Sequence, residues 1–362
     1  MGRTTSISKR LARSVVTGIC RLSSVLGRAE RQLANRLTIL CYHRVLPAER
    51  KKTYFLPDLV VTPESLRLHC EVLRRHFEVL TLHDAYASWS AGSRSERPLA
   101  AITFDDGYRD NLTFAAPVLQ EFALPATFFV IAGLLGSQTP PWYDYLGGAI
   151  ASNADEQCRN RVIALLKRFD VQDNLTLPDR YDRSDAYRVV AAAKTLPSDR
   201  RGELIGEVCN LVGEPEQPKV DDRIMDFQEL AQLRECGHEI GSHSLSHEIL
   251  TLLDETHLAQ EVGQSKHMLE AGLGAQVSSF CYPNGDYNAG VVRAVDHAGY
   301  QCAVSTGTRL NDAATDRFAL NRTFVHEDRL TGIPRSLSPY LLRMEICGLY
   351  DRYLRRHHAA TG

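Results

Sequence analysis

Long apolar runs are missing from this chain of 362 residues. None approaches the roughly 18 consecutive apolar residues that a membrane-spanning helix needs. The apolar segment 15–20 is shorter than the core of a secretory signal and is followed at once by Arg21, so no signal peptide is expected. Paired CxxC spacings are missing too, and the nine cysteines are scattered. They indicate reduced core residues of a cytoplasmic protein rather than a disulfide framework.

A strong net charge is the third absence. The formal charge of -2 gives no overall attraction to nucleic acid, which we therefore exclude as a partner. The charge is nevertheless uneven, because residues 1–36 carry eight basic residues against Glu30 alone. We expect a basic, helical N-terminal arm there, and two interpretations of it stay open. It either contacts anionic lipid, which would associate the protein with a membrane, or is a solvated tail.

Apolar, β-prone segments alternate with helix-like segments along the rest of the chain. The strand candidates are residues 37–42, 79–82, 100–104, 126–131, 238–242, 278–282, 302–305 and 321–325. Helical periodicity occupies residues 111–122, 227–236, 257–271 and 289–298. The repeated order of strand then helix predicts an α/β fold with a parallel sheet. Seven or eight such units favour a closed barrel, with an open doubly wound sheet as the alternative.

One interval, residues 133–225, interrupts this alternation. It is too long for a plain loop and contains helix-like pieces at 158–169 and 187–195, so we predict a helical insertion. At the C-terminal rim of a barrel it would shape substrate access, and on the outer surface it would not. The predicted organisation is an arm at 1–36, a barrel at 37–335 that contains the insertion, and a helical C-terminal tail at 336–362.

Two adjacent acids, Asp105 and Asp106, end one of the apolar strand candidates and precede Gly107. Adjacent carboxylates at such a place are costly unless a cation lies near them. A metal ion would keep one of them ionised and leave the other free to act as a base. The plainer interpretation is that both acids cap the following helix, whose N-terminus favours negative charge.

Two histidines follow another strand candidate. His243 ends the strand and His247 stands four residues later, on an apparent strand-to-helix turn, a spacing that lets two imidazoles face one ion. His238 opens the same strand, so we expect it at the far end, away from the ion. One carboxylate and two histidines leave open coordination positions, which is typical of a catalytic metal site.

Two further strand ends carry polar residues. Tyr282, Pro283 and Asn284 form a turn whose free N–H groups could bind an oxyanion, although an ordinary turn is the plainer interpretation. His43 follows the first strand, where a histidine with satisfied hydrogen bonds is the plainer interpretation. Since active sites of barrels lie at the C-terminal ends of strands, these residues and both pairs above are expected in one site.

These motifs resemble those of the polysaccharide deacetylase family, the NodB-homology group of carbohydrate esterase family 4. Residues 103–107 (TFDDG) resemble its first motif and residues 243–247 (HSLSH) its metal-binding second motif. Residues 280–285 (FCYPNG), 42–45 (YHRV) and 125–129 (PATFF) are similar to one branch of it. The resemblance spans roughly residues 37–330 and implies a distorted (β/α)7-type barrel.

The resemblance also implies roles for the site residues. Asp106, His243 and His247 would hold a divalent metal, Zn²⁺ or an ion such as Co²⁺, and Asp105 would be the general base. The N–H near Asn284 would bind the oxyanion. The family's third motif often begins with an Arg that orients the base, whereas Cys281 stands there in this chain. His326 is the candidate for the general acid, with an exposed histidine beyond a strand as its plainer interpretation.

We therefore expect a hydrolase that removes N-acetyl groups from amino sugars of a polysaccharide, such as an exopolysaccharide, or of its lipid-linked precursor, and releases acetate. Two alternatives stay open. One is a deformylase or another hydrolase of non-peptide amides on the same scaffold, and the other is a catalytically impaired glycan-binding homologue. Asp105 argues against the last, because a protein that only binds metal needs no second carboxylate.

Overall fold

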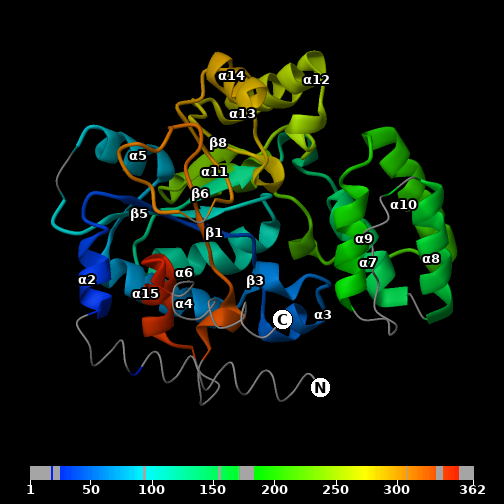
Figure 1. The fold of residues 1–362 in the computed structure, drawn as a ribbon, viewed down its shortest axis with the longest axis horizontal. Helices are drawn as coiled ribbons and strands as arrows, with labels where there is room; N and C mark the ends of the chain where they lie inside the picture. The colour runs from blue at the N-terminus through cyan, green and yellow to red at the C-terminus, as the bar shows by residue number, and fades with distance from the viewer. Residues whose placement is uncertain are drawn as a thin grey trace.

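The computed structural model describes residues 18, 25–92, 95–153, 156–169, 171, 183–307, 309–331 and 337–349 (Figure 1). Its centre is a curled sheet of parallel strands in the order β10-β1-β5-β6-β7-β8-β9. The strands are β1 (Leu37–Tyr42), β5 (Leu99–Phe104), β6 (Thr127–Val130), β7 (Glu239–Ser242), β8 (Ser279–Cys281), β9 (Cys302–Val304) and β10 (Thr323–Phe324). β4 (Glu78–Leu80) pairs with the start of β5, outside this order, and β2 (Arg44–Val45) pairs with β3 (Val60–Val61).

The segment that carries β10 closes the sheet into a distorted barrel. Leu320 forms a parallel bridge with Val304 at the end of β9. Thr323, three residues later, pairs with Leu40 of β1 on the other side. The closed α/β arrangement expected from the alternating pattern is therefore confirmed, and the open doubly wound alternative is wrong. The strand candidate at residues 79–82 corresponds to β4, which lies outside the closed set of seven.

Helices cover the outside of the sheet. All residues of β1, β5 and β6 are buried, as is typical of parallel strands covered on both faces. The helices are α2 (Val25–Arg31), α3 (Ala48–Thr53), α4 (Pro63–His76), α5 (Leu82–Ser90), α6 (Ala116–Glu121), α11 (Phe227–Glu235), α12 (Glu255–Ala259), α13 (Ser265–Leu273), α14 (Ala289–His297) and α15 (Pro339–Ile346). One helical turn, η2 (Asn111–Ala115), leads into α6, and another, η6 (Gln260–Gln264), joins α12 to α13.

The local sequence of α4 illustrates how these helices form. The Thr62 side chain accepts a hydrogen bond from the Ser65 N–H, and Pro63 occupies the first turn, where its missing N–H costs nothing. Leu66 and Leu73 stand two turns apart on one face and are fully buried in the main core. Helices α11 and α14 likewise bury apolar residues in this core, Leu230 and Leu233 in the first and Val291 and Val295 in the second.

The insertion is a helical unit beside the barrel (Figure 1). It contains α7 (Trp142–Asn153), α8 (Glu156–Arg168), α9 (Arg183–Ala193) and α10 (Ser198–Val212), and η4 (Val220–Asp222) follows before the chain returns to the barrel. The helices enclose a core of their own, in which Leu146, Leu204 and Val208 are fully buried. The predicted helical pieces at 158–169 and 187–195 lie in α8 and α9.

Part of the basic arm expected at residues 1–36 packs against the rest of the protein. Leu26 of α2 and Leu33 are buried in the main core, and Glu30 accepts two hydrogen bonds from Arg343 of α15 at 2.6 and 2.7 Å. The apolar residues between the basic ones therefore anchor residues 25–36 to the body. Residues 1–17 and 19–24 lie outside the described residues, as does the part of the predicted tail beyond residue 349.

Helix α15 belongs to that predicted C-terminal tail and packs on α4. Its residues Leu341, Leu342, Met344 and Ile346 are fully buried, so this part of the tail contributes to the core. Within the described ranges, no helix is both long and apolar enough to cross a bilayer. The eight cysteines that the structure describes form no disulfide bond.

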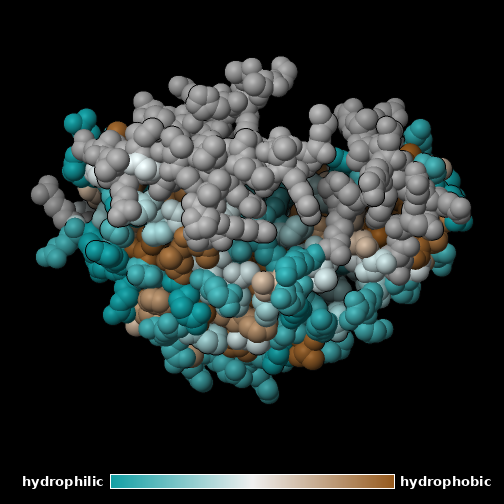
Figure 2. Space-filling view, turned by 90° about the horizontal axis from the view of Figure 1, so that it is seen from below, coloured by the Kyte–Doolittle hydropathy of each residue, from teal (hydrophilic) through white to brown (hydrophobic). Residues whose placement is uncertain are grey.

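In the part of the surface that Figure 2 leaves uncovered, several hydrophobic areas lie among hydrophilic ones. The large hydrophobic side chains that are exposed belong to different elements: Tyr187, Val220, Leu252, Met268 and Tyr287. The apolar surface of the described residues therefore does not single out one docking face. The polar side chains gathered at the C-terminal end of the barrel strands do single out a site.

Candidate active site

Asp105, directly after β5, is paired with an arginine from the far end of the chain. Arg322 Nη1 lies 2.7 Å from Asp105 Oδ1, and Arg322 Nη2 lies 2.7 Å from Asp105 Oδ2. Both side chains are almost completely buried. Burial alone would raise the pKa of Asp105, but the Arg322 guanidinium holds that pKa below its usual range. Asp105 is therefore an ionised carboxylate in a fixed orientation.

Arg322 takes the role of the base-orienting arginine, which Cys281 cannot fill. Its Nη2 lies 3.2 Å from the Cys281 Sγ, and its Nε donates to the Ser305 carbonyl at 3.0 Å. Sequence reasoning missed this residue. A signal was present, since an arginine inside the strand candidate 321–325 needs a buried acid as partner. The arginine that orients the carboxylate thus comes from the closing segment of the barrel rather than from the end of β8.

Asp106 and the two histidines of the second motif form a compact group. The Nε2 atoms of His243 and His247 lie 3.5 and 3.6 Å from Asp106 Oδ1, and all three side chains are buried. The His243 Nδ1–H donates to the Cys281 carbonyl at 2.9 Å, which leaves Nε2 as the free lone pair. Three donor atoms therefore face one point.

The backbone that presents these donors is strained. Asp106, Ser244 and His247 all have positive φ angles, 74°, 64° and 61°. The apparent strand-to-helix turn is a loop, because α12 begins at residue 255. Glu261 holds this loop by accepting the N–H groups of Leu245 and Ser246 at 3.0 and 2.9 Å. Left-handed backbone at non-glycine residues is typical of functional sites.

The group fits a divalent metal. Bonds of about 2.1 Å in tetrahedral geometry place donor atoms about 3.4 Å apart, close to the separations of 3.5 and 3.6 Å found here. Burial and the neighbouring Asp105 raise the pKa of Asp106 to about 8 in the protein alone. A cation is the counter-charge that would keep this carboxylate ionised. Burial also lowers the pKa of both His243 and His247, so the imidazoles are neutral, as metal ligands must be.

The turn after β8 lies at the same end of the barrel. Asn284, with φ 59°, and Gly285 line the pocket of the site. Asn284 is the second residue of the one-turn helix η7 (Pro283–Gly285), where an N–H has no acceptor within the turn. Tyr282 lines the pocket as well, but its hydroxyl donates to the Phe318 carbonyl at 2.8 Å. Pro283 is buried and is not among the described lining residues.

The two histidines expected at the rim lie in different places. His43 lines the pocket, with its Nε2 3.9 Å from Asp105 Oδ2 and its ring centroid 5.0 Å from that of Phe324. Burial lowers the pKa of His43 to about 4. His326 lies further out, beside Phe324, and its Nδ1 donates to the Asp58 carbonyl at 3.2 Å. It lines an adjoining groove rather than the pocket of Asp105.

The insertion forms one wall of the pocket, which has a volume of about 230 Å³. It contributes Tyr143 from α7, Tyr187 and Val190 from α9, and Lys194 directly after α9. The Lys194 Nζ donates to Asn284 Oδ1 at 3.1 Å. The insertion therefore lies at the C-terminal rim of the barrel, which is the first of the two positions that the sequence left open.

Comparison with known proteins agrees with the family resemblance of the two motifs. The polysaccharide deacetylase family model matches residues 92–172 and 214–303. YxkH of Bacillus subtilis (strain 168), provisionally named a polysaccharide deacetylase, is 22% identical over 291 residues, 80% of this chain and 71% of that protein. The matched segments of the family model contain both the Asp105-Asp106 pair and the His243 and His247 pair.

Solved structures share the fold. The Streptococcus pyogenes deacetylase PplD, solved in complex with acetate, superposes with a TM-score of 0.56 and 16% identity, over 86% of this chain and 98% of that one. IcaB from Ammonifex degensii superposes with a TM-score of 0.53 and 17% identity, over 87% and 96%. Since the family model runs from the approach to β5 into β9, the chain belongs to the polysaccharide deacetylase family and is a hydrolase of carbon–nitrogen bonds other than peptide bonds.

Proposed function

We propose that this protein removes N-acetyl groups from amino sugars of a polysaccharide or of its lipid-linked precursor, and releases acetate and a free amine. The observation that carries the proposal is that the two adjacent acids, Asp105 and Asp106, have different partners. Asp106 lies against His243 and His247. Asp105 is instead held by Arg322, so its position does not depend on the proposed metal ligands. A base beside a metal-binding group is the arrangement that amide hydrolysis needs.

Asp105 is assigned the role of general base. Asp106, His243 and His247 would hold a divalent cation, which would supply Lewis-acid polarisation of the acetamide carbonyl and of the attacking water. Asp105 accepts the proton of that water on a carboxylate oxygen. Arg322 keeps the carboxylate ionised and holds it in one orientation, so the Asp105 side chain need not rearrange before proton transfer.

The remaining pocket residues complete the reaction. The Asn284 N–H is assigned to the oxyanion that develops on the acetyl oxygen as water adds to the carbonyl carbon. When the carbon–nitrogen bond breaks, the amine takes up the proton that left the water. His43, 3.9 Å from Asp105, is the nearest imidazole to the base and is assigned to this transfer in place of His326.

The substrate is proposed to extend beyond one sugar. A groove of about 480 Å³ adjoins the pocket and shares Phe55, Tyr187 and Phe324 with it. Its lining is mainly apolar and includes His326 and the segment Pro57–Leu59. Aromatic side chains beside a sugar pocket suit the apolar faces of neighbouring pyranose rings. This arrangement supports an oligosaccharide or polymer as substrate.

The test is acetate release from a panel of N-acetylated oligosaccharides and polymers, with and without a chelator. We expect release from one glycan class that the chelator abolishes and that added Zn²⁺ or Co²⁺ restores. Release of formate from N-formyl sugars in place of acetate would favour the deformylase alternative. Glycan binding without release of either acid, in metal-loaded protein, would favour the catalytically impaired homologue and overturn the proposal.

A further inference from the structure

A tyrosine of the insertion reaches into the proposed metal group. Tyr143, the second residue of α7, is 8% exposed, and its ring centroid lies 5.1 Å from that of His247. Its hydroxyl oxygen is buried and makes no hydrogen bond of ordinary geometry with the described residues. Tyr143, Asp106 and His247 line the same pocket. A buried hydroxyl without an acceptor is costly and calls for a function.

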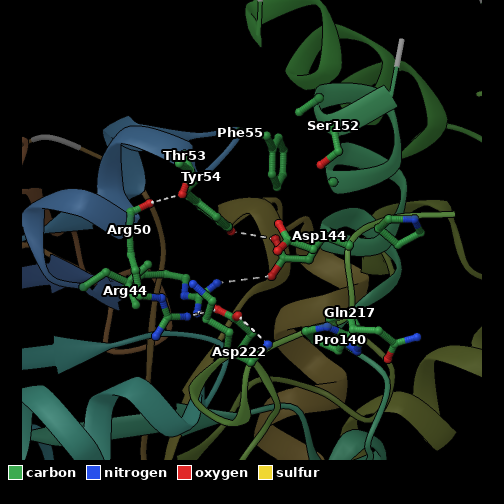
Figure 3. A pocket seen from close by; sticks show the side chains of 17 residues that line it. Arg44, Arg50, Thr53, Tyr54, Phe55, Pro140, Asp144, Ser152, Gln217 and Asp222 are labelled. Atoms are coloured by element: carbon green, nitrogen blue, oxygen red, sulfur yellow. Dashed lines mark hydrogen bonds and ion pairs between the residues drawn. The ribbon is translucent and has the colours of Figure 1, made fainter. Parts of the chain in front are cut away.

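The next residue, Asp144, fixes the position of Tyr143 on the barrel. Its two carboxylate oxygens accept hydrogen bonds from Tyr54 Oη at 2.6 Å and from Tyr108 Oη at 2.8 Å. Tyr108 stands only two residues after Asp106, so this bond ties the start of α7 to the loop that carries the metal group. Figure 3 shows the hydrogen bond between Asp144 and Tyr54, which both line a neighbouring cavity of about 150 Å³.

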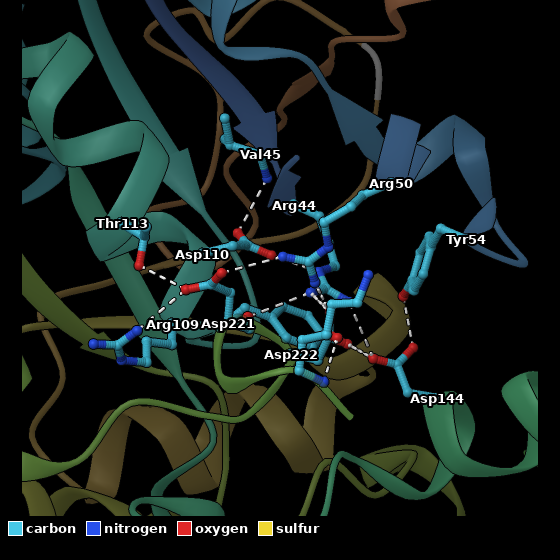
Figure 4. A network of polar contacts seen from close by, with 12 residues as sticks. Arg44, Val45, Arg50, Tyr54, Arg109, Asp110, Thr113, Asp144, Asp221 and Asp222 are labelled. Carbon is cyan, nitrogen blue, oxygen red and sulfur yellow. Dashed lines mark hydrogen bonds and ion pairs between the residues drawn. The ribbon is translucent and has the colours of Figure 1, made fainter. Parts of the chain in front are cut away.

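One buried arginine connects both ends of the insertion to the barrel (Figure 4). The Arg44 guanidinium carbon lies 4.2 Å from the ring centroid of Tyr108, and Nη1 lies 3.7 Å from Asp144 Oδ2. Its Nε donates to Asp110 at 2.6 Å, and its Nη2 donates to Asp222 in η4 at 2.6 Å. Asp144 lies in the first turn of α7 and Asp222 ends η4, so the two residues lie near the two ends of the insertion.

We propose that Tyr143 is a positioning residue of the metal centre and that the insertion is thereby coupled to metal binding. In this proposal the Tyr143 hydroxyl donates to the Asp106 carboxylate when the metal is bound. The Tyr143 ring packs against the His247 imidazole, and the contacts of Asp144 with Tyr54, Tyr108 and Arg44 hold the start of α7 in place. Docking of the insertion then raises the affinity for the metal, and the metal strengthens docking by the same factor. This inference rests on the metal site of the proposed function, but not on which glycan is hydrolysed.

The chain offers matched variants for a test. Tyr143→Phe removes the hydroxyl and keeps the ring against His247. Asp144→Asn keeps the size of the side chain and removes the charge that faces Arg44. Tyr145→Phe is the control, because Tyr145 lies on the same helix and its hydroxyl donates to the surface residue Glu214, away from the metal group.

The measurement is the affinity for Co²⁺ and Zn²⁺ by competition with a chromophoric chelator, without any glycan. We expect Tyr143→Phe to lose about 10- to 100-fold in affinity, the range for groups that orient metal ligands. The visible spectrum of the Co²⁺ form should change with it. Asp144→Asn should lose affinity in the same direction, and Tyr145→Phe should match the wild type. Wild-type affinity and an unchanged Co²⁺ spectrum in Tyr143→Phe would overturn the proposal.

Hydrogen exchange of α7 provides a second readout that does not depend on affinity. Metal should slow exchange of α7 amides in the wild type and in Tyr145→Phe, and should slow it less in Tyr143→Phe. Equal protection by metal in all three proteins would contradict the coupling, even if Asp144→Asn failed to fold. A wild type that binds metal and shows this coupling but releases no acetate would refute the proposed function and leave the coupling intact.

Discussion

Arg322 and Asp105 stand 217 residues apart in the sequence and form a two-point ion pair inside the barrel. The pair brings the closing strand segment into the active site. Bidentate pairs of this kind fix both the charge and the plane of a carboxylate. In the proposed reaction the pair therefore fixes both the protonation state and the orientation of the base, Asp105.

Replacing Arg322 should move the pH dependence of the reaction. In Arg322→Gln the carboxylate of Asp105 loses the charge that lowers its pKa, so that pKa rises and the acid limb of kcat/KM moves to higher pH. Acetate release should fall by about 100-fold or more near neutral pH, and by more at lower pH. Arg317→Gln is the control, since Arg317 pairs with Asp296 at the surface. An unshifted acid limb in Arg322→Gln would refute the role of this pair.

Removing Arg44 should cost stability. Its side chain is 1% exposed and bonds Asp110, which is fully buried. Arg44→Met leaves that carboxylate without its partner, so the free energy of unfolding should fall by about 3–5 kcal/mol. Arg67→Met breaks an exposed pair with Glu121 and should cost less than about 1 kcal/mol. Urea denaturation of both variants provides the comparison, and similar losses in the two would contradict the importance of the buried network.

Gly107 of the first motif should not tolerate a side chain. Its φ is +83°, and a Cβ atom there would lie 2.8 Å from Val130 Cγ1. Gly107→Ala should lower the free energy of unfolding by about 1–3 kcal/mol and reduce metal content, because the strained position adjoins Asp106. Gly206→Ala on α10 meets open space and should be neutral or slightly stabilising. Equal thermal stability of the two variants would contradict this account of the motif.

Two buried histidines should make the fold sensitive to acid. Burial lowers the pKa of His69 to about 3 and that of His238 to about 4, below the ordinary 6.5. As the pH falls from 6.5 toward 4, the unfolded chain binds protons at these residues and the folded chain does not. The free energy of unfolding should therefore fall by up to about 1.4 kcal/mol per pH unit for each of them, and should be unaffected by them above 6.5.

Urea denaturation of His238→Gln between about pH 7 and about pH 4 checks this assignment. The variant should show a shallower decline with pH than the wild type, because one titrating group is gone. His297→Gln, at an exposed position on α14, should leave the slope unchanged. A slope that is the same in all three proteins would show that the acid sensitivity has another origin.

The sequence predicted the parts of the site that lie at strand ends. Apolar runs stop abruptly at Asp105, His243 and His43, and a parallel barrel brings such ends together whatever the details of packing. Arg322 was missed because its partner is distant in sequence, and only its charge within a strand pointed to it. Tyr143 and Lys194 reach the pocket through the docking of a whole helical unit, and such docking leaves no local pattern to read.

The most direct test of the central claim is to compare metal content and acetate release in Asp105→Asn and Asp106→Asn. If Asp105 is the base and Asp106 a ligand, Asp105→Asn should keep metal near one ion per chain and lose turnover. Asp106→Asn should lose the metal and turnover together. Equal loss of metal in the two variants, or turnover retained in Asp105→Asn, would contradict the division of roles on which the proposed reaction rests.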